Sequence, residues 1–466
     1  MDTFSQRRLD CYHDLLTLHR RHPQRYPYLL ESVAHGPGQA RYDILFAFPS
    51  HELRLTSTGM ISGAEGASSG FLAAFDQLWR RERCPAPAGT ALPFRGGWFV
   101  YLGYELAAEI EPGLQLPSDT FSALPIACAR RCPAAIIRDH QQQVIHLVAE
   151  HEYRHCLAQL EQDLRSLPDV TPSSELTQRP LTAITLDEEP AVPFLDAVRR
   201  IKDYIRDGDV FQVNLSRAWR GEIAERITNA DVYQALRRHN PAPFAALAEL
   251  GSGAVISSSP ERLVSVHAGV VQTRPIAGTR PRSAQLQQDA RLSAELLHHP
   301  KERAEHIMLI DLERNDIGRL AQPGTVTVDE LMVLESYAHV HHIVSNVRGR
   351  LRDEVTPVDV IRAMFPGGTI TGCPKVRCME IIAELEQCAR GPYTGSLGYV
   401  NRDGDMDLNI LIRTLVRVGT QLTLRAGAGI VADSDPEREL HETRAKAKGL
   451  LLALGSDPAP PQRLPA

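Results

Sequence analysis

Several features that would place a chain of this length in a familiar class are missing from this sequence. Its eight cysteines are scattered without a C-x-x-C pair, which argues against a disulfide framework and against a zinc site. No apolar run approaches the roughly 20 residues that a membrane-spanning helix needs. Lysines and arginines (51) do not outnumber aspartates and glutamates (57), and the net charge of −6 argues against nucleic acid or an anionic membrane as the main partner. The first residues carry no apolar signal segment, so we expect a reduced, cytoplasmic protein.

What is present is the composition of an ordinary globular chain, since 43% of the 466 residues are hydrophobic and 23% are charged. Residues 1–165 mix short strand-like runs with helices and are interpreted as an N-terminal region. Residues 166–193 are rich in proline, serine and threonine, so this stretch is interpreted as a connector to a second region over 194–454. Residues 455–466 are expected to form a disordered tail.

The second region combines strand and helix patterns without strict alternation, which predicts an α+β architecture with a largely antiparallel sheet system. Asp435 and Pro436 predict the start of the last helix, because aspartate caps a helix and proline suits its first turn. One continuous strand is predicted over Leu408–Val418. Helices are predicted near residues 285–298, 300–314, 356–364, 375–386 and 436–453.

Two pairs of glutamates lie in segments that are predicted to be helical. Glu302 and Glu305 form the first pair, and Glu439 and Glu442 form the second. A spacing of three residues places both carboxylates of a pair on one helical face. Acidic groups on an inward face need a cation, and carboxylates without nearby histidine or cysteine favour a hard ion such as Mg²⁺. The spacing alone leaves open that all four are ordinary solvated glutamates.

Glycines and polar residues near the ends of strands are further candidates for a binding site. Gly427 and Gly429 lie in a strand-like run, where glycine indicates either the close approach of a ligand or a simple bulge. The turn FPGGTITGCPK contains Lys375 but lacks the Ser or Thr of a phosphate-binding loop, which excludes nucleoside triphosphate binding. Glu261 follows a serine-rich strand, which is compatible with partial burial and a raised pKa. His342, in AHVHHIVS, suits catalysis or hydrogen bonding better than a zinc site.

Taken in order, these segments resemble the chorismate-utilising enzymes, a family that includes anthranilate synthases, aminodeoxychorismate synthases, isochorismate synthases and salicylate synthases. The N-terminal region is similar more loosely, through YLLES and GGWFVYLGYEL. The resemblance implies the fold of anthranilate synthase component I: a large antiparallel β-sandwich flanked by helices and made of two interleaved halves, with the chorismate-binding catalytic domain over 194–454. From about residue 195 to 453 the resemblance is carried by GDVFQVNLS, SSSPERL, QTRPIAGTRPR, ERAEHIMLIDLERNDIGR, HHIVS, FPGGTITGCPKVRCMEIIAELE, GPYTGSLGY, MDLNILIRT and AGAGIVADSDPERELHETRAKA.

The resemblance also implies roles for the matching residues. Glu305 and Glu442 would be the direct Mg²⁺ ligands, with Glu302 and Glu439 supporting them through water, so that the ion holds the ring carboxylate of chorismate. Arginine, lysine and backbone donors would clamp the rest of this dianion. The implied substrate-binding residues are Gln212, Thr371, Gly372, Tyr393, Arg413, Gly427, Gly429 and Lys446.

Three of the matching positions bear on the chemistry. Glu261 matches the general acid that protonates the departing ring hydroxyl, and His342 matches a histidine near the ring. Gln212 stands where isochorismate and salicylate synthases carry a lysine that activates water, which points to ammonia as the nucleophile. None of the eight cysteines has the G-x-C-x-G surroundings of a glutaminase, so a separate glutamine amidotransferase subunit is expected to supply the ammonia.

Two ammonia-using branches of the family remain. Aminodeoxychorismate synthase component I makes 4-amino-4-deoxychorismate for p-aminobenzoate and folate, and MDLNILIRT and GPYTGSLGY resemble this branch. Anthranilate synthase component I makes anthranilate for tryptophan, and Ala277 in PIAGT resembles that branch, because many aminodeoxychorismate synthases carry a lysine there that is proposed to bind the ring covalently. Leu29–Ser32 resemble a tryptophan-binding segment, with a structural role as the alternative. An inactive scaffold for an amidotransferase is the remote alternative.

Overall fold

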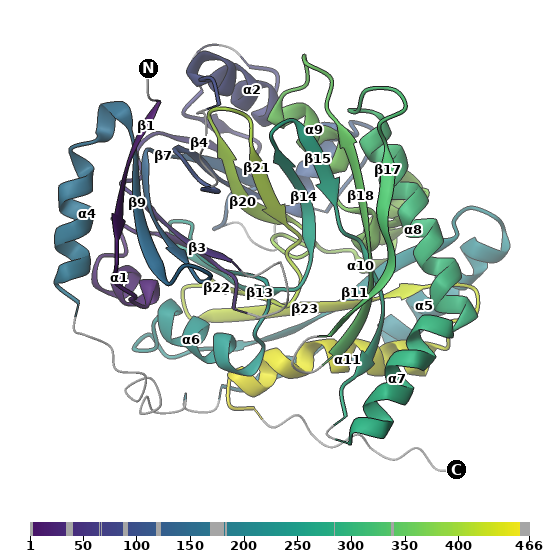
Figure 1. Ribbon diagram of the computed structural model, residues 1–466. Coiled ribbons are helices and arrows are strands. Elements are labelled where there is room, and N and C mark those ends of the chain that lie inside the picture. Colours follow the sequence, from purple (N-terminus) through teal and green to yellow (C-terminus); the bar gives the residue numbers. More distant parts are fainter. Residues whose placement is uncertain are drawn as a thin grey trace.

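Two large antiparallel sheets form the framework of the protein (Figure 1). The computed structural model describes residues 3–33, 41–64, 66, 68–86, 92–117, 123–167, 181, 184–283, 285–336 and 340–456. Within these residues the first sheet has 12 strands and the second has 11. The expected α+β fold with a large antiparallel sheet system is therefore confirmed.

The first sheet joins strands from both halves of the chain. Its middle pair is β2 and β12, in which Leu29 lies opposite Leu247. In spatial order its strands are β1 (Phe4–Leu9), β9 (Val144–Glu150), β8 (Ala134–Asp139), β3 (Tyr42–Ala47), β2 (Tyr28–Glu31), β12 (Phe244–Glu249), β13 (Gly253–Ser259), β22 (Thr414–Val418), β23 (Gln421–Ile430), β11 (Gln212–Glu222) and β10 (Leu186–Glu188), with β19 (Gly372–Cys373) beside β11.

The second sheet is interleaved in the same way. Its β6 pairs with β20, so that Val100 lies opposite Gly398. Its strands are, in order, β16 (Ile276–Pro281), β18 (Val340–Arg350), β15 (Val270–Thr273), β14 (Arg262–His267), β21 (Met406–Asn409), β20 (Ser396–Asn401), β6 (Gly97–Leu102), β7 (Ala127–Cys132), β4 (Glu52–Leu55) and β5 (Ile61–Ser62), with β17 (Thr327–Ser336) beside β18.

An aromatic core holds the two sheets face to face. Tyr28 of the first sheet stacks on Phe99 of the second, with ring centroids 3.8 Å apart and planes 3° from parallel. Phe46 packs edge-on against the same Phe99 at 5.7 Å. These side chains are buried among alanines, leucines and valines from both sheets, which is the packing of a β-sandwich.

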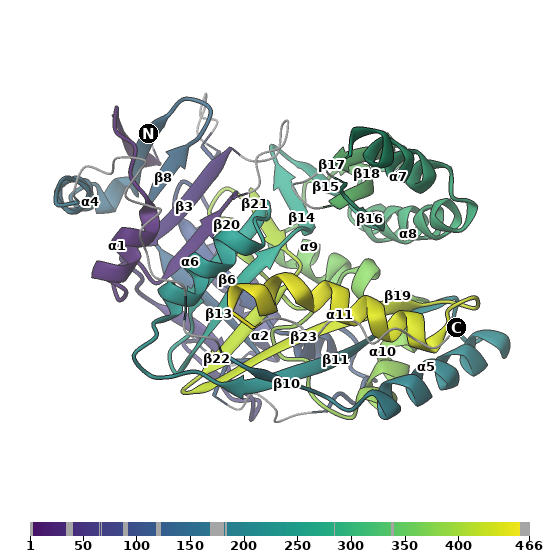
Figure 2. The ribbon, with the colours of Figure 1, turned by 90° about the horizontal axis from the view of Figure 1, so that it is seen from below.

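Helices cover the outer faces of the sandwich. Figure 2 shows α11 and α5 lying across β23 and β11, where Val198, Ile201 and Leu440 are buried against the sheet. On the second sheet, Ile310 of α8 is buried in the same core as Val347 of β18. The α-helices are α1 (Leu15–Arg21), α2 (Phe71–Glu82), α3 (Ala107–Ile110), α4 (Cys156–Arg165), α5 (Ala191–Arg206), α6 (Asn229–His239), α7 (Leu286–His298), α8 (Pro300–Gly318), α9 (Pro357–Met364), α10 (Lys375–Glu386) and α11 (Pro436–Ala453).

The predicted helices of the second half are confirmed, but one predicted strand is wrong. The Asp435 side chain caps α11 as expected, by accepting the backbone N–H of Arg438 at 3.0 Å. The run Leu408–Val418 is not one strand, because β21 ends at Asn409 in the second sheet and β22 begins at Thr414 in the first. Arg413, in the break, has a left-handed φ of 52°. The chain crosses between sheets there, which hydrophobic alternation cannot reveal.

The interpreted connector and tail are only partly described. Within the connector, β10 pairs with β11, so that Leu186 lies opposite Gly221. Just before it, the N–H of Ile184 donates to the carbonyl of Leu454 at 2.9 Å. Residues 168–180 and 457–466 lie outside the described residues, so the expected disordered tail stays a prediction. In the part of the chain that is described, no helix has the length and apolar character needed to cross a membrane.

Candidate functional site

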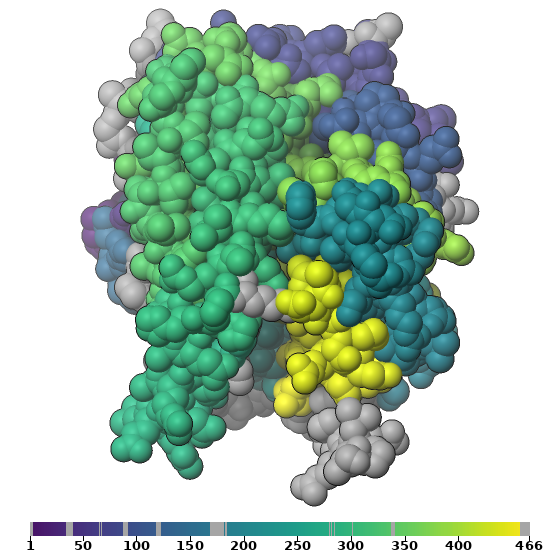
Figure 3. Space-filling model, turned by 90° about the vertical axis from the view of Figure 1, so that its right-hand side faces the viewer, coloured from purple at the N-terminus to yellow at the C-terminus, as the bar shows by residue number. Residues whose placement is uncertain are grey.

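The candidate site lies in a cleft between two parts of the second half of the chain. Figure 3 shows this hollow between the green surface that contains α7 and α8 and the yellow surface of α11. α8 carries Glu302 and Glu305, and α11 carries Glu439 and Glu442. The two glutamate pairs thus belong to helices on opposite walls of the cleft.

Glu302 and Glu442 each form an ion pair with a cation of the protein. Glu302 accepts a hydrogen bond from Arg280 at 3.1 Å, and Glu442 forms an ion pair with Lys446 at 2.7 Å. Glu439 is buried and Glu305 is half-buried. Among the described residues, no three acidic, histidine or cysteine side chains are gathered closely enough to hold a metal ion. The donor chemistry of the pairs, carboxylate oxygens only, nevertheless suits Mg²⁺.

Glu261 is held in a buried position at the turn from β13 to β14. The Thr369 hydroxyl donates to Oε1 of Glu261 at 2.8 Å, and the backbone N–H of Ile276 also donates to this carboxylate. Burial raises the pKa of Glu261 to about 7, although Arg413 and Lys446 lie near enough to oppose the shift. A carboxyl group with this pKa can hold a proton near neutral pH and release it to a substrate.

His342 lies on β18, close to the same cations. Burial lowers its pKa to about 4, and Arg413 and Lys446 add to the shift. Its imidazole is therefore neutral at neutral pH and can accept a proton. The imidazole of the preceding His341 is hydrogen-bonded on both sides: Nδ1 lies 2.7 Å from the Ser336 hydroxyl, and Nε2 lies 3.0 Å from Oδ1 of Asp289.

A second group of candidates surrounds the break between β21 and β22. Burial lowers the pKa of the Arg413 guanidinium, while Tyr393, Glu261 and Glu442 oppose that shift. Tyr393 is buried, and its hydroxyl would lie 2.7 Å from a Cβ placed on Gly427. Only glycine at 427 lets the tyrosine approach the strand so closely. Arg413, Tyr393 and the side-chain-free backbone at Gly427 are thereby brought together.

Lys446 fastens α11 to this stretch of backbone. Its ammonium group donates to the carbonyl of Gly427 at 2.9 Å and pairs with Glu442 on the same helix. Lys446, Gly427 and Glu442 therefore form one contiguous unit. The structure places Arg413, Tyr393, Gly427, Lys446 and Glu442 next to one another, and their roles stay predictions.

The remaining candidates line the start of β11. A Cβ on Gly429 would lie 2.6 Å from Nε2 of Gln212, and the bridge between β11 and β19 brings Gly372 next to this strand. Thr371 is fully buried, and its hydroxyl donates to the carbonyl of Gly367 at 2.9 Å. Within the described residues, Oε1 of Gln212 is buried and accepts no hydrogen bond. An acceptor of this kind suits a donor on a ligand.

Residue-by-residue reasoning missed a buried acidic cluster behind Glu261. Glu313 and Asp316 of α8 are buried, and Asp316 forms an ion pair with Lys375 at 2.6 Å. Burial, followed by the charge of Asp316, raises the pKa of Glu313 to about 8. The i, i+3 spacing of the two acids on the inward face of α8 was the available signal. Lys375, considered only as a phosphate-binding lysine, is instead a structural ion-pair partner.

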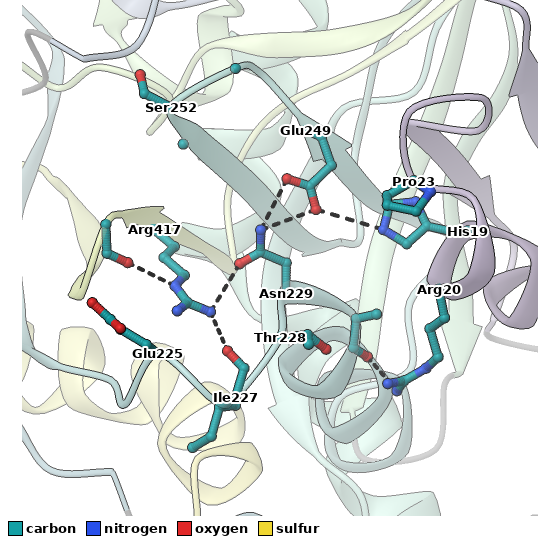
Figure 4. Close-up of a pocket in the computed structure, with 14 residues that line it drawn as sticks. His19, Arg20, Pro23, Glu225, Ile227, Thr228, Asn229, Glu249, Ser252 and Arg417 are labelled. Carbon is teal, nitrogen blue, oxygen red and sulfur yellow. Dashed lines mark hydrogen bonds and ion pairs between the residues drawn. The ribbon is translucent and has the colours of Figure 1, made fainter.

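Another hollow, of about 450 Å³, lies between α1 and the start of α6 (Figure 4). Its polar groups bind one another: Asn229 donates to Glu249 at 3.0 Å, and Arg417 donates to Oδ1 of Asn229 at 3.3 Å and to the carbonyl of Ile227 at 2.5 Å. None of the predicted site residues lines this hollow. We therefore do not assign the candidate site to this hollow.

A smaller hollow of about 150 Å³ contains part of the YLLES segment. Leu30, Glu31 and Ser32 line it together with Phe244 and Tyr399. Glu31 is buried and accepts a hydrogen bond from Tyr233 at 2.8 Å. The segment thus contributes both to a pocket and to the packing of α6, and binding of tryptophan there stays a prediction.

Comparison with known proteins adds an independent finding. The profile of the chorismate binding enzymes matches residues 33–452. The chain is 46% identical over 369 residues to an anthranilate synthase component I-like protein of Synechocystis sp., covering 78% of this chain and 73% of that relative. It is 44% identical over 373 residues to aminodeoxychorismate synthase component 1 of Bacillus subtilis (strain 168), covering 78% and 77%.

A solved structure shows the same fold. The crystal structure of anthranilate synthase component I from Streptococcus pneumoniae superposes with a TM-score of 0.78 at 34% sequence identity. The superposition covers 90% of this chain and 93% of the other. The fold implied by the sequence resemblance is confirmed by this likeness.

Proposed function

Because the chain belongs to the family of chorismate binding enzymes, we propose that it converts chorismate and ammonia to 4-amino-4-deoxychorismate, the reaction of aminodeoxychorismate synthase component I. The 44% identity to the Bacillus subtilis relative of that name supports this proposal. The observation that carries it is the buried Glu261 carboxyl, whose pKa of about 7 suits a general acid, beside Arg413 and Lys446. Such a group can protonate a poor leaving group inside a site built for an anionic substrate.

The proposed clamp for chorismate uses the cations of the cleft. Arg413, Tyr393 and the backbone at Gly427 would hold the enolpyruvyl carboxylate, because a guanidinium and a phenol beside an open strand offer several donors. Thr371 and Gly372 would line the ring. Gln212 would offer its buried amide oxygen to a donor on the substrate or to ammonia.

The ring carboxylate would lie against the acidic walls of the cleft. Glu305 and Glu442 would hold a Mg²⁺ ion directly, and Glu302 and Glu439 would hold its water ligands. Bound there, the ion would neutralise the ring carboxylate and fix its position. Lys446 now pairs with Glu442 at 2.7 Å, so its ammonium group would have to exchange this partner for the substrate.

Ammonia is the proposed nucleophile, and a separate glutamine amidotransferase subunit is its proposed source. Gln212, an amide, cannot take a proton from water as a lysine amine can. Glu261 would donate its proton to the ring hydroxyl, so that water leaves as the C–N bond forms. The enolpyruvyl group stays on the ring in this reaction.

Anthranilate synthesis is the alternative that specific residues favour. Loss of pyruvate needs a base near the ring, and His342 is neutral at neutral pH because burial lowers its pKa to about 4. Ala277, buried opposite Ile343, also resembles the anthranilate branch. An inactive scaffold for an amidotransferase is a remote alternative, since the acid and the cations of the site are all present.

Incubation of the protein with chorismate, Mg²⁺ and ammonium separates these functions. Aminodeoxychorismate yields p-aminobenzoate only after its lyase is added, whereas anthranilate is fluorescent and appears directly. We expect p-aminobenzoate with the lyase and no fluorescence without it. Direct fluorescence would establish the alternative, and unchanged chorismate, with or without an amidotransferase, would favour the scaffold. The Glu261→Gln variant is the control for contaminating activity.

A further inference from the structure

The acidic cluster behind Glu261 is connected to it through a short turn. Glu313 of α8 accepts the backbone N–H of Gly368, and the next residue, Thr369, donates its hydroxyl to Oε1 of Glu261 at 2.8 Å. The turn over Gly368–Ile370 thus has one acid on each side. The carboxyl of Glu313 lies against its backbone, and the carboxyl of Glu261 receives its side chain.

The close fit of α8 against this turn is visible at Gly368. A Cβ at this position would collide with Cδ2 of Leu312 and would lie 3.3 Å from Oε1 of Glu313. Glu313 is buried, so its hydrogen bond to the turn is shielded from competing water. The ion pair between Asp316 and Lys375, at 2.6 Å, anchors the same side of α8 to the start of α10, just beyond the turn.

We propose that Glu313 is a positioning residue for the reaction: by holding the N–H of Gly368, it aims the Thr369 hydroxyl at Glu261. This inference rests on the proposed role of Glu261 as the general acid. Thr369 fixes the orientation of the Glu261 carboxyl, and the Glu313–Gly368 bond fixes the backbone that carries Thr369. Glu313 itself touches neither substrate nor Glu261 in this scheme, so its loss acts on turnover and not on substrate binding.

The bond that Glu313 makes requires an acceptor and not a charge. A glutamine at 313 offers a carbonyl oxygen of nearly the same reach, whereas a leucine fills the space without an acceptor. The pair Glu313→Gln and Glu313→Leu therefore isolates the hydrogen bond from the volume of the side chain. Thr369→Val removes the donor to Glu261 while keeping the shape of the side chain.

A double-mutant cycle tests the connection. We expect Thr369→Val and Glu313→Leu each to lower kcat about 10-fold, the scale of one lost hydrogen bond, with KM for chorismate changed less than about twofold. Because Glu313 acts through Thr369, the variant carrying both changes should be no slower than Thr369→Val alone. Glu313→Gln should restore kcat to within about threefold of the unchanged protein.

The outcomes separate this inference from the proposed function. If the variant with both Glu313→Leu and Thr369→Val shows a kcat about 100-fold below that of the unchanged protein, Glu313 acts independently of Thr369 and the inference is overturned. If Glu261→Gln keeps its activity, the proposed acid is wrong, whatever the cycle shows. Asp311→Leu, on the exposed side of α8, controls for leucine in this helix, and thermal unfolding of every variant shows whether a loss of kcat reflects loss of folded protein.

Discussion

At the scale of single residues, Glu261 sets the pH range in which the protein can act. Its carboxyl is buried, and its pKa lies at about 7 in place of an ordinary value near 4.5. Two consequences follow, one for turnover and one for stability. Both have a definite sign, because burial favours the protonated form of an acid.

Turnover should fall as the pH rises through about 7, because the general acid must carry its proton when the ring hydroxyl leaves. The measurement is kcat against pH between 5.5 and 9, as rough limits, with ammonia held constant as the free base. Glu261→Gln should lower kcat by about 10²- to 10⁴-fold, and the fall of kcat above about pH 7 should disappear in this variant. A profile that stays flat up to pH 9 would contradict the role of Glu261.

Stability should respond to pH in the same direction. The raised pKa means that the protonated acid contributes stability that is fully present below about 4.5 and is lost as the pH rises through about 7. Between about pH 5 and pH 8, the free energy of unfolding of the unchanged protein should fall by about 3 kcal/mol more than that of Glu261→Gln, because glutamine does not titrate. Urea unfolding at the two pH values measures this difference, and an equal pH dependence in both proteins would refute it.

Ala277 leads to a prediction about intermediates. It is buried on β16, opposite Ile343, and offers no nucleophile to the ring. Intact-protein mass spectrometry after rapid quenching with chorismate should show the unmodified mass at every time point. A transient gain of mass would mean that another side chain forms a covalent adduct.

At the scale of elements, α8 and α11 matter because each carries an acidic pair to one wall of the cleft. Both helices and the cap of α11 were predicted from the sequence. The i, i+3 spacing also predicted which carboxylates lie on the same helical face. The cation that pairs with Glu302 could not be predicted from the sequence. Lys446 lies four residues after Glu442 on α11, so their ion pair follows from helical spacing, whereas Arg280 of β16 reaches Glu302 only because β16 packs beside α8.

Substitution of the proposed direct ligands tests these elements. Glu305→Gln and Glu442→Gln should each abolish measurable turnover at any ammonium concentration and weaken Mg²⁺ binding, because each removes one charged ligand. Calorimetric titration with Mg²⁺ in the presence of chorismate provides a readout besides activity. Glu437→Gln, exposed in the first turn of α11, is the matched control. Near-normal binding in the ligand variants would refute the metal site.

At the scale of the whole molecule, the two sheets make the halves of the chain inseparable. Strands from before and after the connector are neighbours in both sheets, through β2 with β12 and β6 with β20. The stacked rings of Tyr28 and Phe99 belong to different sheets of the same sandwich. Neither half can therefore complete a sheet or a core alone.

Expression of the chain in two pieces tests this interdependence. Residues 1–167 and 184–466, produced together as separate chains, should assemble into a folded complex that binds chorismate. Either piece produced alone should lack cooperative thermal unfolding, because it would leave open sheet edges and an exposed apolar core. If the piece of residues 184–466 folded alone, the two halves would not depend on each other as described.

The helices, the antiparallel class of the fold and the family could be predicted from the sequence alone, since periodicity, caps and ordered motifs are local properties of the chain. The sequence also indicated Glu261 and the two glutamate pairs. The break of Leu408–Val418 at Arg413, the contact of Glu313 with the turn next to Glu261, and the ion pair of Glu302 with Arg280 became known only from the packed structure. These features depend on contacts between residues far apart in the chain, and burial, which sets the pKa of the acid, exists only once the sheets have packed.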